Sequence, residues 1–107
     1  MFVQPILPSE ARTTSGESQI IPIDYYTNAQ VFLDITAASG TSPTLDVTIE
    51  YSPDGSRWFT HTSFSQKTTT GKDTLRISSL GAYMRIKYTI AGTTPSFTFS
   101  VDIVFGR

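Results

Sequence analysis

The fold is decided by residues 31–51, which read VFLDITAASGTSPTLDVTIEY. Apolar side chains occupy every second position from Val31 to Ile35, and again from Leu45 to Tyr51. The positions between them are mostly polar or charged. A period of two is typical of a strand with one buried face and one solvated face. The stretch therefore predicts two half-buried strands joined by a short polar connection.

The same period recurs toward the C-terminus, from Met84 to Ile90 and from Phe97 to Phe105. No segment has apolar residues at convincing helical spacing. The prediction is an all-β fold, an antiparallel β-sandwich of about seven or eight strands, jelly-roll-like or immunoglobulin-like, with no helix longer than a turn. The residues predicted to form its core are Val31, Leu33, Ile35, Leu45, Val47, Ile49, Trp58, Leu75, Ile77, Met84, Ile86, Phe97, Phe99, Val101 and Ile103.

An internal repeat accompanies the alternation. Residues 39–49, SGTSPTLDVTI, align without gaps with residues 91–101, AGTTPSFTFSV. A glycine, a threonine, a hydroxyl residue, a proline and another hydroxyl residue recur before the alternating apolar positions. Duplication and shared loop chemistry would each explain the repeat. We favour a structural equivalence, such as two pseudo-symmetric hairpins at one end of a sandwich.

Composition limits the possible functions. The chain has 107 residues, which suits one domain, and its formal net charge of -1 gives no basic surface for nucleic acid or an anionic membrane. It contains no cysteine, which excludes disulfides, thiolate metal sites and cysteine nucleophiles. We therefore expect no nucleic-acid partner and no membrane partner.

The N-terminal segment differs from the rest of the chain. Residues 1–17 contain two prolines within a short apolar stretch, followed by a polar run. Because proline cannot donate a hydrogen bond to a sheet, this segment is at best extended or at an edge. We expect an extended arm over residues 1–17 and a β-sandwich domain over residues 18–107. A frayed terminus is the alternative to an arm whose apolar residues dock on a neighbouring subunit.

Residues that could carry chemistry do not form a recognisable site. The single histidine, His61, lies among hydroxyl residues without a nucleophile motif before it, and is expected at an exposed strand position. Asp46 and Glu50 are four residues apart on one strand face, roughly 13 Å. Asp34 would join them if their strands pair, in a weak Ca²⁺ site without loop spacing. The prediction is no enzyme, no catalytic residue, no cofactor and no metal.

Basic residues are few and scattered. Arg76, Arg85 and Lys87 are expected on the outer faces of two strands that could be neighbours. In a chain with a small negative net charge, pairing of these residues with acids across strands is the preferred interpretation.

Residues 52–58, SPDGSRW, contain a tight turn followed by the only tryptophan. Proline presets φ, aspartate bonds its own backbone and glycine allows a positive φ. The pattern resembles a hairpin of discoidin-type carbohydrate-binding sandwiches, in which the tryptophan packs inward. Because a tryptophan face can stack on a sugar, a carbohydrate-binding module is an alternative function.

Four segments together resemble small virion proteins of tailed bacteriophages. They are residues 37–49, residues 51–55 with Trp58, Leu80-Gly81 before the Tyr83 strand, and residues 90–97. The resemblance covers roughly residues 29–105 and leaves out the N-terminal segment. It implies a non-enzymatic structural protein, a head decoration (cement) protein that stabilises the capsid; a tail or head-tail adaptor component is the alternative.

The same resemblance implies the partners. They are the major capsid protein or other virion proteins, and further copies of this chain, with a homotrimer favoured. The location is then the virion, assembled in the host cytoplasm. No functional residue is carried over, because the shared positions belong to turns and core. The residues expected to contact a partner are Phe2, Val3, Ile6, Leu7, Phe32 and Val104.

Overall fold

The computed structural model describes residues 2–23, 26–78, 80 and 82–106. Within these ranges there are seven strands and no helix, which confirms the predicted all-β antiparallel fold. No helix that could span a membrane is found in this part of the chain. The strands are β1 (Phe2–Arg12), β2 (Gly16–Glu17), β3 (Ile21–Pro22), β4 (Asn28–Ser52), β5 (Phe59–Ser63), β6 (Gly71–Ile77) and β7 (Tyr83–Gly106).

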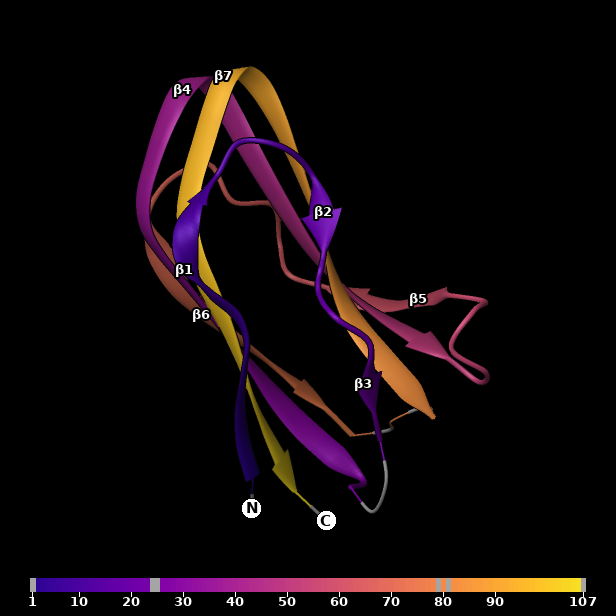
Figure 1. Cartoon of the computed structure of the whole chain (residues 1–107). Helices are drawn as coiled ribbons and strands as arrows, with labels where there is room; N and C mark the ends of the chain where they lie inside the picture. Colours follow the sequence, from indigo (N-terminus) through magenta and orange to yellow (C-terminus); the bar gives the residue numbers. More distant parts are fainter. Residues whose placement is uncertain (1, 24–25, 79, 81, 107) are drawn as a thin grey trace.

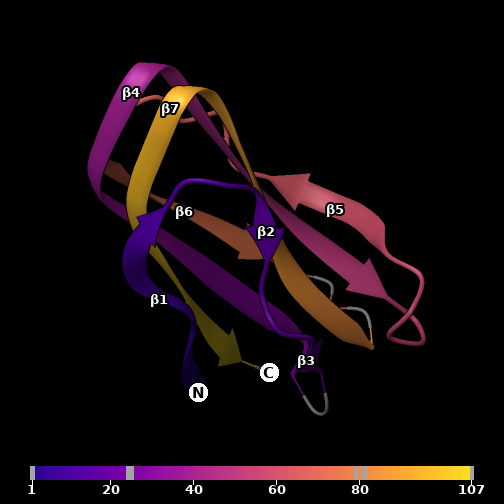
Figure 2. The same ribbon diagram turned by 45° about the horizontal axis from the view of Figure 1, so that its top comes forward.

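β4 and β7 form one long antiparallel ribbon, from Asn28 opposite Gly106 to Ser52 opposite Tyr83. The sheet order is β1-β7-β4-β5, with β6 also paired to β4, and β2 and β3 paired to β7. Figure 1 shows the ribbon bending at the end of the molecule away from both termini, so that its halves face each other. One continuous sheet thus supplies both layers of the sandwich, which Figure 2 shows from a second direction.

The bend divides the strands between two layers. The first layer contains β1, the C-terminal half of β7, the N-terminal half of β4, and β6. The second layer contains β2 and β3, the N-terminal half of β7, the C-terminal half of β4, and β5. Because successive side chains alternate across a strand, each layer has one face toward the other layer and one face toward solvent.

The bend is built by the two copies of the sequence repeat, which lie opposite each other on β4 and β7. Gly40 and Gly92 have φ values of +112° and +121°. A Cβ on Gly40 would lie 2.7 Å from the carbonyl oxygen of Thr94, and one on Gly92 would lie 2.9 Å from that of Ser42. Each copy therefore needs a glycine where the backbone of the other copy approaches, as in a local two-fold arrangement.

This geometry corrects the expectation of two hairpins. Ser39 pairs with Ser96 and Thr41 pairs with Thr93, so both strands continue through the bend. The register of the ribbon shifts on both sides of Thr41, and such irregularities let paired strands bend sharply. The two segments are structurally equivalent, as expected, but they form one shared bend.

The core lies between the two layers. Every predicted core residue is buried except Trp58 and Leu75, which are half-buried. Further buried apolar residues that were not predicted are Ile6, Leu7, Ile21, Ala29, Phe64 and Phe105.

The N-terminal segment is extended, but β1 is an edge strand of the sheet rather than an arm outside the domain. It pairs with the C-terminal half of β7, with register shifts between Pro5 and Leu7 and between Leu7 and Glu10. These shifts place the consecutive residues Ile6 and Leu7 both in the core. Ile6 and Leu7 therefore stabilise their own chain and are not available to a neighbouring subunit.

A buried arginine holds the irregular strand in place. Arg12 is only 7% exposed, and its guanidinium donates to the carbonyl oxygens of Pro8 at 2.7 Å, Phe99 at 2.7 Å and Glu10 at 3.2 Å. The same group lies over the ring of Phe99, 4.6 Å from its centroid, and 5.7 Å from that of Tyr88. Arg12 thus satisfies carbonyls of the irregular part of β1 and joins them to β7.

Candidate functional site

The outer face of the first layer carries exposed apolar side chains. Val3 on β1 lies opposite Val104 on β7. Asp102 on β7 lies opposite Pro5 of β1 on one side and opposite Phe32 of β4 on the other. Phe32 and Val104 are therefore diagonal neighbours, roughly 7 to 8 Å apart. Val3 is 61% exposed and Phe32 is 40% exposed. We call Val3, Pro5, Phe32 and Val104 the outer apolar face.

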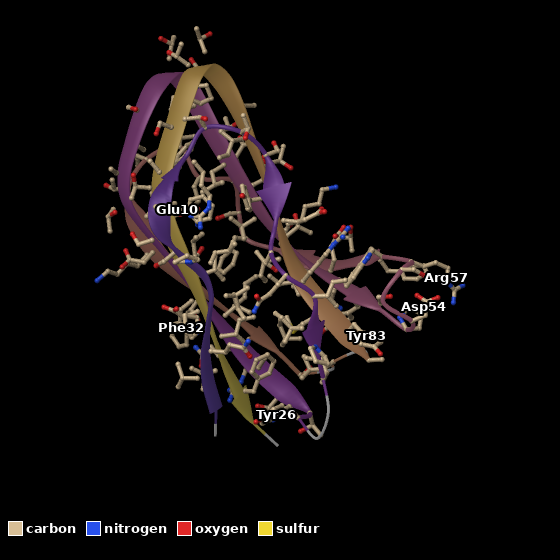
Figure 3. All side chains as sticks on the ribbon, in the orientation of Figure 1. Glu10, Tyr26, Phe32, Asp54, Arg57 and Tyr83 are labelled. Carbon is tan, nitrogen blue, oxygen red and sulfur yellow. The ribbon has the colours of Figure 1, made fainter. Side chains whose placement is uncertain are left out.

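Polar side chains border the outer apolar face on the side of β4 and β6, and one lies within it. Gln30 lies opposite Val104 on one side and Arg76 on the other, and its amide donates to Thr74 Oγ1 at 3.0 Å. Asp102 lies between Pro5 and Phe32 in the register, so one carboxylate stands among the apolar side chains of this face. Exposed apolar side chains next to polar ones are typical of a protein contact surface. In Figure 3, Phe32 points away from the space between the layers.

The structure separates the predicted contact residues into groups. Val3, Phe32 and Val104 come together on the outer apolar face. Ile6 and Leu7 lie in the core. Phe2 pairs with Phe105, while its side chain is outside the described part. Pro5, which the sequence marks only as a strand breaker, also belongs to this face. Its outward position depends on the register of β1 against β7, which the sequence pattern does not reveal.

His61 is exposed on β5, as expected, and stacks on Tyr51 of β4 with ring centroids 4.3 Å apart. Burial raises the pKa of Tyr51 to about 12. Among the described residues, no group of three or more His, Cys, Asp or Glu side chains could hold a metal ion. The stacking gives His61 a structural role at the edge of the second layer.

The three carboxylates that could have formed a cation site do not converge. Asp34 belongs to the first layer, opposite Lys72 and Ser100. Asp46 belongs to the second layer, where it accepts hydrogen bonds from the Gln66 amide. Because β4 passes through the bend between the two positions, the strand pairing that such a cation site would need does not occur.

The third carboxylate, Glu50, belongs to a charged cluster on the second layer. Arg85 Nε donates to Glu50 Oε1 at 2.7 Å, and Arg85 Nη1 lies 3.7 Å from Glu17 Oε2. The guanidinium also lies over the Trp58 ring, 4.3 Å from its centroid. The predicted cross-strand pairing of Arg85 with an acid is confirmed, whereas Arg76 is in the other layer and is not its neighbour. One face of Trp58 is thus covered and is not open to a sugar.

The tight turn after β4 is held by its own side chains. Ser52 Oγ accepts hydrogen bonds from the N–H groups of Asp54 and Gly55. Asp54 Oδ1 accepts from the N–H groups of Ser56 and Arg57, and Oδ2 accepts from Arg57 Nε. These bonds, chiefly that from the Arg57 backbone, hold the pKa of Asp54 far below its usual range. The turn, labelled at Asp54 and Arg57 in Figure 3, is a structural element. Gly81, part of the Leu80-Gly81 segment that the phage resemblance includes, lies outside the described residues.

A hollow of about 260 Å³ lies beside the loop between β5 and β6. Two of its three charged side chains pair with each other, because Lys67 Nζ lies 2.5 Å from Asp73 Oδ2. That ammonium group lowers the pKa of Asp73. The remaining lining consists of three threonines, Gln66, Gly71, Lys72 and the apolar residues Leu33 and Ile35. The hollow therefore contains one ion pair and no aromatic side chain.

Comparison with known proteins identifies a shared fold. No protein-family model matches the chain, and no curated protein matches it. Among solved structures, the SPBc2 prophage-derived protein YomS matches over 98% of this chain and 94% of its own, with a TM-score of 0.54 and 12% sequence identity. At this identity the likeness establishes the fold, which a prophage-derived protein also adopts.

Proposed function

We propose that this protein is a non-enzymatic structural component of a tailed-bacteriophage particle. It acts as a head decoration protein that binds the assembled major capsid protein through the outer apolar face. Its location is the virion, assembled in the host cytoplasm. Binding requires no catalytic group and no cofactor.

One observation carries this proposal, the outer apolar face itself. Val3 and Phe32 remain exposed beside Pro5 and Val104, and elsewhere in the described part of the chain the exposed large hydrophobic side chains are those of Ile20 and Phe59. Contiguous exposed apolar residues with a polar rim mark surfaces that bind another protein. The face lies on three paired strands, β1, β7 and β4, so it is presented without an ordering cost for a loop.

The fold comparison and the sequence resemblance support a phage origin. The structural neighbour YomS is described as prophage-derived. The segments that resemble phage virion proteins form the bend at Gly40 and Gly92 and the turn at Asp54, which are scaffold features of this fold. These segments support the assignment to phage structural proteins. The outer apolar face supports the proposal that the protein binds another protein through this surface.

Stabilisation of a capsid would follow from binding to the assembled shell alone. A ligand that binds only the assembled state, at a free concentration of about 100 times Kd, adds about 2.7 kcal/mol per site to the stability of that state. Many copies at symmetry-related sites would add such contributions over a whole shell. A modest affinity per copy is therefore sufficient to stabilise the shell.

Co-sedimentation with heads of the phage that encodes the protein tests this proposal. We expect the purified protein to sediment with full heads, and heads stripped of it to open at a lower temperature. Binding to tails, or to the head-tail connector in rings of six or twelve copies, would support the adaptor alternative instead. Heads that neither bind the protein nor lose stability without it would contradict a decoration role.

A further inference from the structure

A carboxylate stands in the middle of the outer apolar face. Asp102 on β7 lies between Pro5 on β1 and Phe32 on β4, and Val104 is two positions further along the same face. Directly opposite residues have Cβ atoms roughly 4.5 to 5.5 Å apart, so Pro5 and Phe32 are immediate neighbours of this carboxylate. Asp102 is half-buried, whereas Phe32 beside it is 40% exposed. The face thus combines an exposed ring with a charge that is partly removed from solvent.

The described part of the chain does not neutralise Asp102. Within it, no hydrogen bond or ion pair reaches the Asp102 carboxylate. The basic residues on this side of the first layer, Lys72 and Arg76, belong to β6 and flank Thr74, which is opposite Phe32. The strand β4 therefore separates them from Asp102. The carboxylate can accept hydrogen bonds from another molecule.

This charge limits what can cover the face. Burial of an ionised carboxylate without a counter-charge is strongly unfavourable, and the centres of protein interfaces are depleted of charged residues for this reason. An apolar partner surface would cover Val3 and Phe32 but would leave Asp102 without a hydrogen-bond donor. The partner must therefore supply a donor at this point, and a positively charged donor also neutralises the carboxylate.

We propose that the partner inserts an arginine side chain between the Asp102 carboxylate and the ring of Phe32. The inference rests on the proposed function, in which this face binds the major capsid protein. A guanidinium group can donate two parallel hydrogen bonds to a carboxylate, and its plane can also pack on an aromatic ring. A lysine ammonium group carries the same charge, but it is a strongly hydrated point charge without a planar face. Arginine therefore satisfies both neighbours with one side chain.

The second layer of the same chain contains such an arrangement. Arg85 Nε donates to Glu50 Oε1 at 2.7 Å, and the guanidinium lies over the Trp58 ring, 4.3 Å from its centroid. A carboxylate and an aromatic ring thus hold one arginine between them on a sheet surface. On the outer apolar face, Asp102 and Phe32 supply the carboxylate and the ring from paired strands. There the arginine would come from the partner.

The two side chains have different roles in this complex. Phe32 supplies apolar area, which favours any partner with a complementary shape. Asp102 supplies specificity, because a surface without a cation at this point would leave the carboxylate buried and unpaired. Removal of Asp102 would in turn leave the partner's cation buried without a counter-charge, which accelerates dissociation.

The affinity of Asp102 variants of the full chain for full phage heads tests the inference. Asp102→Asn keeps the size of the side chain and removes its charge. We expect it to weaken binding by about tenfold or more, chiefly through faster dissociation. Asp46→Asn is the matched control, because Asp46 is also half-buried on a strand but belongs to the second layer. It makes the same change in net charge and should bind as the unmodified protein does. Circular dichroism shows whether each variant is folded.

Asp102→Leu distinguishes a cationic partner surface from an apolar one. If the partner presents an arginine, Asp102→Leu should weaken binding at least as much as Asp102→Asn, because the cation would be buried against an apolar side chain. If the partner surface is apolar, Asp102→Leu should bind more tightly than the unmodified protein. Tighter binding of Asp102→Leu, or unchanged binding of Asp102→Asn, would overturn the inference.

Phe32→Ser separates failure of this inference from failure of the proposed function. Weaker binding of Phe32→Ser and of Asp102→Asn, with a loss in the double variant smaller than the sum of the two, would support one partner side chain that contacts both residues. Weaker binding of Phe32→Ser alone would mean that the face binds heads without an arginine at Asp102, and would contradict only this inference. Heads that do not bind the unmodified protein would contradict the proposed function and the inference with it.

Discussion

Gly40 on β4 and Gly92 on β7 occupy equivalent positions in one bend, each against the backbone of the opposite repeat. Their φ values, +112° and +121°, lie in a region that residues with a Cβ rarely adopt. This reciprocal arrangement lets a single ribbon supply both layers of the sandwich. Each copy of the repeat also includes the start of the strand segment that follows the bend, and both of these segments contribute apolar residues to the same core.

Alanine at either glycine tests this arrangement. Gly40→Ala and Gly92→Ala should each lower the free energy of unfolding by about 1 to 3 kcal/mol, because both the positive φ and the opposing carbonyl disfavour a Cβ. Thr41→Ala, an exposed neighbour, should change it by less than about 0.5 kcal/mol. Denaturant unfolding measures all three. A loss at only one of the glycines would show that the two copies of the repeat are not equivalent.

The N-terminal strand should be a stabilising part of the domain. Replacing Arg12 with Met leaves buried carbonyl groups, including that of Phe99, without a donor, at a cost of about 1 to 3 kcal/mol. Deletion of residues 1–17 should cost more, since it also removes Ile6 and Leu7 from the core. Amide hydrogen exchange should show loss of protection in the C-terminal half of β7 in both variants. Unchanged exchange there would mean that β1 acts as an independent arm.

The alternation of residues 31–35 and 45–51 was sufficient to predict the fold class, because a period of two has one physical reading when a face is buried. The bend could not be predicted in the same way. Glycine, threonine and proline in sequence are equally suited to a hairpin turn and to an irregular stretch of paired strand. Only the pairing of Thr41 with Thr93, a long-range contact, distinguishes the two.

The candidate site was predictable only in part, because part of it depends on the register between strands. Phe32 and Val104 interrupt polar faces of regular strands, and this signal is visible in the sequence. Ile6 and Leu7 are neighbours in sequence, and a regular strand would place them on opposite faces. Both are buried because the register of β1 shifts around them, which depends on the surrounding structure. Trp58 was expected in the core, yet it is half-buried and its ring packs against the guanidinium of Arg85.

The turn at Asp54 should make stability depend on pH. Backbone N–H groups of Arg57 and Ser56 hold the folded-state pKa of Asp54 below its unfolded value. The stabilisation is therefore present above the unfolded pKa and is lost as the pH falls through the folded pKa. Asp54→Asn should be less stable than the unmodified protein at pH 7, and the difference should shrink as the pH falls below about 4. Thermal unfolding at several pH values measures this difference.

A matched control removes a carboxylate charge from a strand instead of the turn, as in Asp102→Asn on β7. This variant lacks any change in the turn, so the pH-dependent difference should be specific to Asp54→Asn. A constant stability difference for Asp54→Asn across the acid range would contradict the role given to these hydrogen bonds.

The Arg85 cluster should be sensitive to removal of one partner. Glu50 is 7% exposed, and Arg85→Met leaves its carboxylate without the bond to Nε, at a cost of about 3 to 5 kcal/mol. The double variant Glu50→Gln with Arg85→Met should recover part of this loss, because no unpaired charge remains. Chemical denaturation of the two single variants and the double variant gives the free energies of unfolding for a double-mutant cycle. Additive losses would show that the two side chains do not stabilise each other.

The most direct test of the central claim is the affinity of a face variant for phage heads. Phe32→Ser should fold normally, because the side chain is exposed, and should weaken binding to full heads by about tenfold or more, as expected for a contact worth at least about 1.4 kcal/mol. Ile20→Ser, which changes an exposed apolar residue outside the outer apolar face, serves as the matched control and should bind normally. Equal head binding by Phe32→Ser and the unmodified protein would contradict the claim that this face attaches the protein to the particle.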